Sequence, residues 1–377
     1  PTIAADGTLS YSLNGATGTA SLYAYLTDDN TINGNAPLSS TFYFFIITNQ
    51  APADYQVTYA GGALSVTDNA GNSDTLSLYE RSDEPGRVRF YAVGRTFNVN
   101  GGLNSITETN VSFLMADLTT SVTMNAGAGN NTVRLQSNIP GNVLTLPSLT
   151  INGGAGNDSV QMAVSINFLP GASLDVDLQN DAGGAGLDSF ATAANDLLMP
   201  LLGTGSATIK CSGGITLGNG CQLTTVNGDL TLEANQQAVA SVGSFHGISL
   251  GSNARVQASG TGQVKVKGRS GDSASLVGVR MLGGAPILGG TTGTLNINAV
   301  SNASSSGSAS YGLGMFAPAA TINTAGANVV IQGTAFATGG GSGGGVWVDG
   351  GVISEGGAGP VSVTGTGGGG GPDSGRG

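Results

Sequence analysis

Five glycine-led segments decide the fold of this chain. They are Gly214-Ile-Thr-Leu, Gly247-Ile-Ser-Leu, Gly278-Val-Arg-Met, Gly312-Leu-Gly-Met and Gly345-Val-Trp-Val. The spacings between their glycines are 33, 31, 34 and 33 residues. In each segment the second and fourth residues are apolar, which predicts a short strand with one buried and one exposed face.

Each repeat carries two more apolar signals behind this leading strand. A second alternating pair follows the glycine after 16 or 17 residues, at Leu230/Leu232, Val264/Val266, Leu295/Ile297, Val329/Ile331 and Val361/Val363. A middle apolar residue lies between the two strands, at Leu223, Val256, Ile287, Ile322 and Ile353. Each repeat therefore predicts about three short strands separated by glycine-rich corners.

The repeats predict a stacked architecture. One repeat cannot bury its own apolar stripe, whereas stacked repeats place like residues above like residues and close a continuous core. The sequence therefore predicts an all-β fold, a parallel β-helix (β-solenoid) with about three strands per coil of 31–34 residues. A β-propeller is the alternative, but its four-stranded blades of about 40–50 residues exceed this period.

The predicted solenoid has two parts. Residues 214–377 form five regular repeats, and residues 122–213 form an irregular start in which the related stretches 125–133 and 152–160 are 27 residues apart. No polar cap follows the last repeat. Because a bare solenoid end leaves strand edges unpaired, we expect further coils or another subunit to cover it.

Two β-rich modules precede the solenoid. Residues 1–52 contain strand patterns over 7–13, 20–26 and 40–47, too few for a complete sandwich, and predict a partial antiparallel β-sandwich of the immunoglobulin or cadherin type. Residues 53–121 predict a β-rich connecting module, in which charged residues flank a Pro85-Gly86 turn and indicate a solvated hairpin.

Composition limits the classes of partner. Only 9% of the residues are charged, the net charge is −11 and the pI is about 4.3. Such a chain offers no basic surface for phosphates, so we expect no nucleic-acid partner and no docking on anionic lipid. No apolar run approaches the ~20 residues of a transmembrane helix, so we expect no transmembrane segment in this piece.

One motif suggests a metal ion. The stretch Gly153-Gly-Ala-Gly-Asn-Asp-Ser-Val-Gln161 matches the calcium-binding nonapeptide pattern, with Asp158 as the charged ligand. Calcium needs about six to eight oxygens, which tandem copies of the motif supply. The related stretch 125–133 has Ala126 and Asn131 at key positions. Asp158 is therefore a calcium candidate beside the alternative of a tight turn, and we expect no other metal or cofactor.

Catalytic groups of a β-helix would have to converge on one outward face. Lys265, Lys267 and Arg269 form a basic cluster, but no acidic partners recur on the same strand in neighbouring coils. Asp175 and Asp177 share one strand face about 7 Å apart, a spacing that suits either a glycosidase pair or a solvated face. We therefore expect no catalytic residues and no enzymatic activity.

Four further residues carry distinctive chemistry. His246 precedes a glycine at a repeat boundary, and we interpret it as structural. Cys211 and Cys221 match no zinc pattern, and they either form a disulfide or are two buried small residues. Trp347 points outward by alternation, where it stacks on a sugar or partner or packs under a glycine-rich loop. Trp347 is therefore the candidate binding residue.

Several stretches resemble known bacterial surface proteins. The stretches 6–13, 26–30 and 42–46 look like the end of bacterial cadherin-like or immunoglobulin-like modules. The stretches 226–237, 264–272 and 361–369 resemble the β-strand repeats of giant surface proteins in planctomycete-type bacteria, which are similar to filamentous-haemagglutinin-like solenoids. The resemblance implies secretion and surface display, and it brings no catalytic residues.

Together these features predict a structural extracellular or cell-surface protein whose coils form a stiff, non-catalytic rod. An adhesin that binds glycans or another cell surface is the second hypothesis, and a β-helix enzyme that degrades polysaccharide is the third. The partners that we expect are further copies, joined end to end, or surface glycans.

Overall fold

The structure is a computed structural model that describes residues 53–99, 109–179, 186–302, 310–336, 343–354, 356–357 and 359–368, together with the backbone of four strands nearer the amino terminus. The chain forms two compact units, Pro1–Pro52 and Ala53–Gly377. The described residues contain no α-helix, and η1 (Met115–Asp117) is a single 3-10 turn.

The first unit contains two antiparallel strand pairs. β1 (Thr2–Ile3) pairs with β2 (Leu9–Ser10), and β3 (Gly18–Ala24) pairs with β4 (Tyr43–Asn49). β2 falls in the predicted stretch 7–13, and β3 and β4 overlap the predicted stretches 20–26 and 40–47. The rest of the predicted partial sandwich lies outside the described residues.

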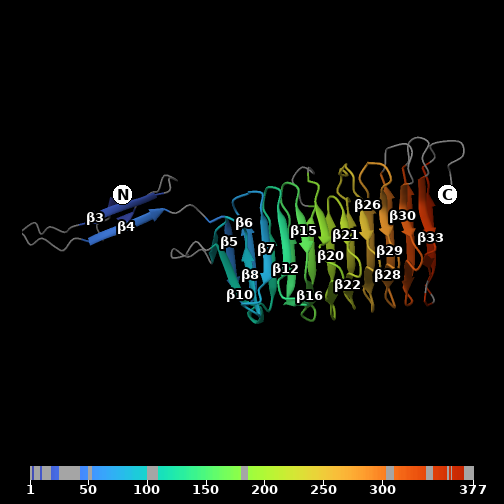
Figure 1. Ribbon diagram of the computed structural model, residues 1–377, viewed down its shortest axis with the longest axis horizontal. Helices are drawn as coiled ribbons and strands as arrows, with labels where there is room; N and C mark the ends of the chain where they lie inside the picture. The colour runs from blue at the N-terminus through green and yellow to red at the C-terminus, as the bar shows by residue number, and fades with distance from the viewer. Residues whose placement is uncertain are drawn as a thin grey trace, which may run out of the picture. The chain divides into compact units, whose positions relative to one another are not determined.

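The second unit is a parallel β-solenoid with three sheets along its length (Figure 1). Sheet I has eleven strands in the order β10 (Asn110–Leu114), β8 (Arg87–Tyr91), β7 (Thr75–Glu80), β12 (Thr132–Ser137), β15 (Ser159–Met162), β18 (Ser189–Thr192), β21 (Ile215–Leu217), β24 (Ile248–Leu250), β27 (Val277–Met281), β30 (Ser310–Phe316) and β33 (Gly343–Asp349). At ~4.8 Å between strands, eleven strands extend over roughly 48 Å.

Sheet II contains twelve strands. Their order is β35 (Val361–Thr366), β32 (Asn328–Ala335), β29 (Thr294–Ser301), β26 (Val264–Arg269), β23 (Leu230–Ala234), β20 (Ala207–Cys211), β17 (Leu174–Leu178), β14 (Ser148–Asn152), β11 (Ser121–Asn125), β6 (Ala63–Asp68), β5 (Tyr55–Ala60) and β9 (Phe97–Val99). From β6 to β32, each strand of sheet II is followed in the chain by one of sheet I, so the two sheets share a corner along the solenoid.

Sheet III closes the coils on their third side. It consists of β19 (Leu198–Leu201), β22 (Gln222–Thr225), β25 (Arg255–Ala258), β28 (Pro286–Gly289), β31 (Thr321–Thr324) and β34 (Val352–Ile353). In earlier coils β13 (Val143–Leu146) pairs in parallel with β16 (Ser165–Phe168). Three strands per coil, as the sequence predicts, are therefore confirmed from β20 to β35.

The predicted register is confirmed in all three sheets. In sheet I, Ile215 pairs with Ile248, and the same file continues through Val279, Leu313 and Val346. Sheet III aligns the middle apolar residues, Leu223, Val256, Ile287, Ile322 and Ile353. Sheet II aligns Leu230, Val264, Leu295, Val329 and Val361. Apolar side chains thus lie in vertical files inside the solenoid, where burial stabilises a coil only when another coil lies against it.

The solenoid begins earlier in the chain than residue 122, where the sequence placed its start. β6 and β7 pair in parallel with β11 and β12. The stretch 53–121, predicted as a connecting module, thus contributes strands to the solenoid sheets themselves. The glycine-led period is missing from this part of the chain, so its coils carry no repeat signal in the sequence.

Antiparallel strands close the amino-terminal end of this solenoid. β5 pairs antiparallel with β6, and β8 pairs antiparallel with both β7 and β10. Phe90 and Phe97 are completely buried, and the ring of Phe97 stacks on that of Tyr55 with centroids 4.9 Å apart. The β7–β8 pairing confirms the predicted hairpin around Pro85-Gly86. Reversing the strand direction gives the first coil a partner that covers its apolar residues.

The last coil differs from the others in exposure. Val361 and Val363 occupy inward file positions but are 40% and 46% exposed, whereas Val264 and Val266 in the same files are 0% exposed. The comparison shows that the inward valines of a coil become buried when the following coil packs against them.

Candidate binding surface

Trp347 belongs to a group of three aromatic residues on the outer side of sheet I, here called the aromatic surface. Tyr311 and Phe316 come from β30, and Trp347 comes from the neighbouring strand β33. The ring of Tyr311 lies 5.2 Å from that of Trp347 and 5.5 Å from that of Phe316, measured between centroids. Trp347 is 40% exposed, and the other two are partly buried.

Two glycines leave room for these rings against the sheet. A Cβ atom on Gly314 would lie 2.3 Å from the ring of Phe316, and one on Gly344 would lie 2.9 Å from the ring of Tyr311. Any larger residue at either position would push a ring away from the strands. The glycines therefore let Tyr311 and Phe316 pack close to the backbone beside Trp347.

A cation lies next to the aromatic surface on the same face. Arg280 of β27 pairs in register with Gly314, which in turn pairs with Trp347. Gly314 has no side chain, so only the aromatic rings separate Arg280 from Trp347 along this file. Arg280 is partly buried and forms no ion pair with any other residue that the structure describes.

His246 has a structural role near this arginine. Its Nδ1 atom accepts a hydrogen bond of 3.1 Å from the backbone N–H of Val277 on the next coil. Burial, and secondarily the positive charge of Arg280, lower the pKa of His246. A neutral imidazole therefore joins two coils, which fits the predicted structural role.

Asp158, the calcium candidate, lies in a buried ladder of polar side chains at the corner between sheets II and I. Its two carboxylate oxygens accept hydrogen bonds from the backbone N–H groups of Asn131 (2.8 Å) and Gly154 (2.7 Å). Its side chain is only 3% exposed. Calcium needs oxygen ligands, whereas this carboxylate faces N–H donors, so the geometry supports the alternative of a tight turn.

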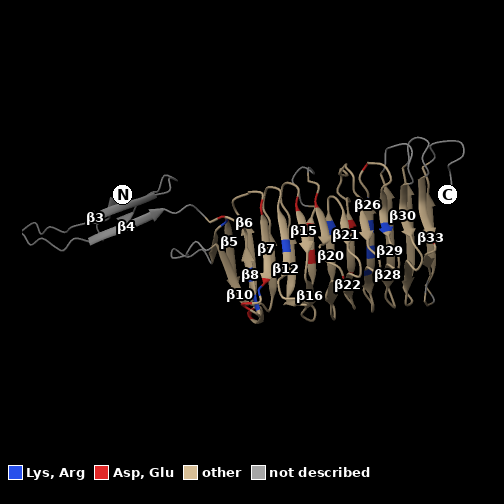
Figure 2. Ribbon diagram, viewed as in Figure 1, with Lys and Arg blue, Asp and Glu red and all other residues tan. Residues whose placement is uncertain are grey.

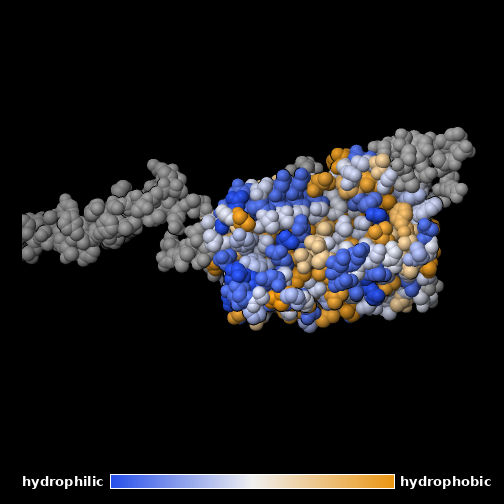
Figure 3. Space-filling model, in the orientation of Figure 1, coloured by the Kyte–Doolittle hydropathy of each residue, from blue (hydrophilic) through white to orange (hydrophobic). Residues whose placement is uncertain are grey.

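The same arrangement links five coils. The backbone N–H of Asp74 donates to Asn131 Oδ1 (3.1 Å), that of Asp158 to Asp188 Oδ1 (2.6 Å), and that of Asp188 to Ser212 Oγ (2.8 Å). Acidic residues line this upper edge of the solenoid in Figure 2, and hydrophilic ones do so in Figure 3. We call the series of Asp74, Asn131, Asp158, Asp188 and Ser212 the polar ladder.

The two aspartates considered as a glycosidase pair lie on the outer face of sheet II. In register, Asp175 pairs with Thr150 and Thr208, and Asp177 pairs with Asn152 and Lys210. Burial, followed by the charge of Asp177, raises the pKa of Asp175. The face is an ordinary strand surface, on which both aspartates pair in register with polar residues.

The predicted basic cluster lies three coils away on the same face. Lys265, Lys267 and Arg269 all come from β26. Lys267 forms an ion pair of 2.8 Å with Glu233 of the preceding coil. Glu233 in turn pairs in register with Lys210, so opposite charges alternate along this file, from Asp177 to Lys267. The charges stabilise neighbouring strands rather than converge on one point.

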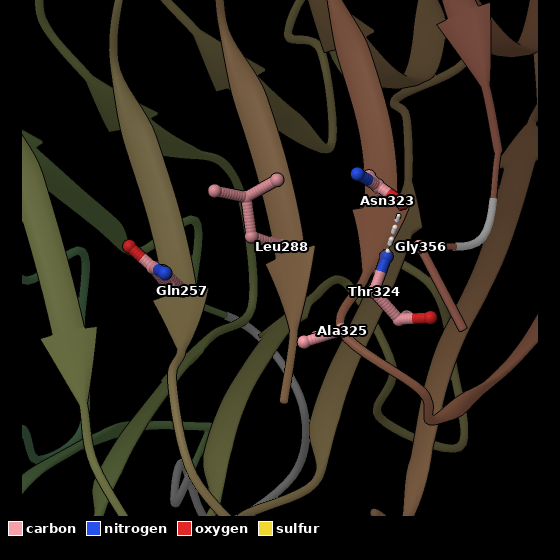
Figure 4. A pocket seen from close by; sticks show the side chains of 7 residues that line it. Gln257, Leu288, Asn323, Thr324, Ala325 and Gly356 are labelled. Carbon is pink, nitrogen blue, oxygen red and sulfur yellow. Dashed lines mark hydrogen bonds between the residues drawn. The ribbon is translucent and has the colours of Figure 1, made fainter. Parts of the chain in front are cut away.

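A shallow groove of about 250 Å³ crosses sheet III (Figure 4). Gln257, Leu288 and Asn323 line it from three successive strands, and the backbone N–H of Thr324 donates to Asn323 Oδ1 (2.7 Å). None of its lining residues is charged. No sequence pattern indicated this groove, because its residues are ordinary outward residues of a repeat.

The two cysteines are both buried and are not bonded to each other. Cys221 Sγ donates to Thr192 Oγ1 (3.3 Å) and Ala194 O (3.2 Å). Burial, with nearby carboxylates, raises the pKa of the Cys211 thiol. The structure thus shows the second alternative of the sequence, two buried small residues.

No combination of these groups forms a metal centre within the described part of the chain, where no three His, Cys, Asp or Glu residues cluster to hold an ion. Among the same residues no helix is long and apolar enough to cross a membrane.

Three comparisons with known proteins complete the description. The chain matches no protein-family model, no curated protein and no solved structure. The fold alone therefore defines its class: it is an all-β protein whose second unit is a parallel β-solenoid.

Proposed function

We propose that this protein is a non-catalytic structural protein of the cell surface or extracellular space, with its solenoid as a stiff scaffold. The observation that carries the proposal is the continuous register of the three sheets across successive coils. The resemblance of its repeats to giant surface proteins with filamentous-haemagglutinin-like solenoids supports secretion and display.

Stiffness follows from the direction of the backbone hydrogen bonds. In a parallel solenoid these bonds run along the axis, so bending the stack strains bonds in at least one sheet. The apolar files add burial between every two coils, and the polar ladder adds hydrogen bonds at one corner. Because only 9% of the residues are charged, salt and pH should change this scaffold little.

The distribution of charged groups supports a non-catalytic role. Arg81 pairs with Asp83, Arg89 with Glu84 and Arg95 with Asp74, all near the closed amino-terminal end. Farther along, Lys267 pairs with Glu233. These acids and bases neutralise one another, whereas general acid–base catalysis requires groups that face a substrate.

Single-molecule pulling tests the scaffold directly. A solenoid that fails coil by coil should lengthen in regular steps, each of about 110 Å for a coil of some 33 residues. One cooperative rupture of the entire solenoid at low force would contradict the proposal. Labelling of intact cells with a membrane-impermeant reagent tests the location, and labelling only after lysis would contradict surface display.

Self-association is the partner that this proposal includes. The exposed side chains of Val361 and Val363 on β35 offer an apolar face for contact with a second copy. Sedimentation at increasing protein concentration should show dimers that Val363→Lys abolishes. A concentration-independent monomer would contradict association.

A further inference from the structure

The aromatic surface and Arg280 form a combination that the scaffold role does not require. Aromatic rings with a free face stack on the apolar face of sugars, and guanidinium groups bind carboxylates through paired hydrogen bonds. Burying the three rings of Tyr311, Phe316 and Trp347 together stabilises the fold, but exposing 40% of the side chain of Trp347 adds nothing to it.

We propose that the outer side of sheet I at β27, β30 and β33 binds an acidic polysaccharide, whose sugar rings stack on Trp347 and Tyr311 and whose carboxylate pairs with Arg280.

One unpaired cation favours an anionic ligand. Arg280 is the cation of β27, β30 and β33, and it forms no ion pair with any residue that the structure describes. The carboxylate of these strands, Asp349, lies at the end of β33 in register with Phe316. A neutral sugar would leave the Arg280 guanidinium without a partner, whereas the carboxylate of a polyuronate would pair with it.

The geometry suits a polysaccharide that runs along the solenoid axis. Arg280, Gly314 and Trp347 lie in one file on three neighbouring strands, so Arg280 and Trp347 are two strand spacings apart, about 10 Å. Gly314 leaves room in the middle of the file, where the ring of Phe316 packs against the strand beside the ring of Tyr311. A linear sugar chain laid over the file would contact the aromatic rings at one end and the guanidinium at the other.

The single tryptophan of the chain makes the test direct, because Trp347 fluorescence reports only on this surface. The probes are a soluble oligogalacturonate and its fully methyl-esterified form, which has the same rings without charge. We expect a saturable change in Trp347 emission with the acidic oligomer, weakened by salt. We expect no such change with the ester at the same concentration.

Matched variants separate binding from folding. Arg280→Gln should weaken binding of the acidic oligomer about tenfold, equivalent to about 1.4 kcal/mol. Trp347→Ala should abolish binding measured by calorimetry. Phe336→Ala removes another exposed aromatic ring, 54% exposed and outside this surface, and should leave binding unchanged.

Three outcomes would overturn the proposal. They are the absence of binding to the folded wild-type protein, equal affinity for the acidic and esterified oligomers, and unchanged affinity in Arg280→Gln. Melting temperatures of all variants equal to that of the wild type would show that lost binding does not reflect unfolding. Because the pulling experiment needs no ligand, failure of this proposal and failure of the scaffold function are distinguishable.

Discussion

The corner between sheets II and I is built in two different ways along the same solenoid. In the amino-terminal coils the polar ladder fills it, with Asp158 and Asp188 3% and 1% exposed. In the carboxyl-terminal coils glycines fill it, and the backbones of the two sheets approach each other directly. A Cβ on Gly333 would lie 2.0 Å from Gly345 O, and one on Gly278 would lie 2.4 Å from Val300 N.

The two solutions lie one position apart in the register, because Asn131, Asp158 and Asp188 directly precede Thr132, Ser159 and Ser189. The file that begins Thr132, Ser159 and Ser189 continues as the leading glycines of the repeats, from Gly214 to Gly345. Hydroxyl groups of Thr132 and Ser159 lie 2.9 Å apart, whereas the later positions have no side chain at all. One fold therefore accepts either hydrogen-bonded side chains or bare backbone at this corner, provided that every coil fits its neighbour.

The largest effect should come from adding one methyl group to the glycine-built corner. Gly333→Ala places a Cβ against the backbone of Gly345, so we expect a loss of about 3 kcal/mol in the free energy of unfolding. Denaturant titration measures it. Gly283→Ala, where the nearest atom lies 3.5 Å from the new Cβ, is the control and should cost much less. Equal stability of both variants would refute close packing at this corner.

Removing one side chain of the polar ladder should have the next largest effect. Asp158→Ala leaves the N–H groups of Asn131 and Gly154 without their acceptor, which should cost about 2 kcal/mol. Hydrogen exchange should show both amides losing protection. The control is Asn157→Ala, because Asn157 is exposed and accepts a single bond from the N–H of Leu187. A loss as large in the control would show that burial does not matter there.

Removing a charge from the outer face of the amino-terminal coils should have a smaller effect, and it should stabilise the protein. The raised pKa of Asp175 means that burial and Asp177 penalise its ionised form in the native state. Asp175→Asn should therefore stabilise the protein at pH 7 by less than about 1 kcal/mol. The gain should vanish below about pH 3, where the aspartate is protonated in both states. A melting temperature lowered at pH 7 would contradict this assignment.

His246 gives the carboxyl-terminal coils a weak dependence on pH. Its folded pKa is lowered, so below about pH 6.5 the unfolded chain takes up a proton that the native imidazole resists. Stability should therefore fall slightly as the pH decreases through this range. Melting curves of wild type and His246→Gln between pH 8 and pH 5 measure the difference. Parallel curves for the two proteins would show that His246 is not the group responsible.

Chelation should have the smallest effect. Both carboxylate oxygens of Asp158 accept hydrogen bonds from backbone N–H groups and do not need an ion. Excess chelator should therefore leave the melting temperature unchanged. A clear decrease, restored by calcium, would show that an ion stabilises the amino-terminal coils after all.

Sequence patterns predicted part of the candidate binding surface. Alternation placed Trp347 on the outer face, but it would place Tyr311 inward with Leu313 and Met315, since all three are odd-numbered. In the structure Tyr311 contacts Trp347 instead. Alternation describes a regular strand, whereas Tyr311 lies near the start of β30, where the two sheets approach each other. The glycines at 314 and 344 were the available signal for rings packed on the strands.

By itself the sequence determined the coil, its period and its register from residue 214 onward. A one-residue slip would expose every apolar file, so the spacing of apolar residues alone specifies which strands pair. Only the tertiary structure decided how the first coils are closed and how their corner is filled. Hydrogen bonds such as those from Asp74 to Asn131 and from Asp158 to Asp188 join residues 57 and 30 positions apart, and no common period marks them. Such contacts depend on which coils become neighbours, which is a property of the folded stack.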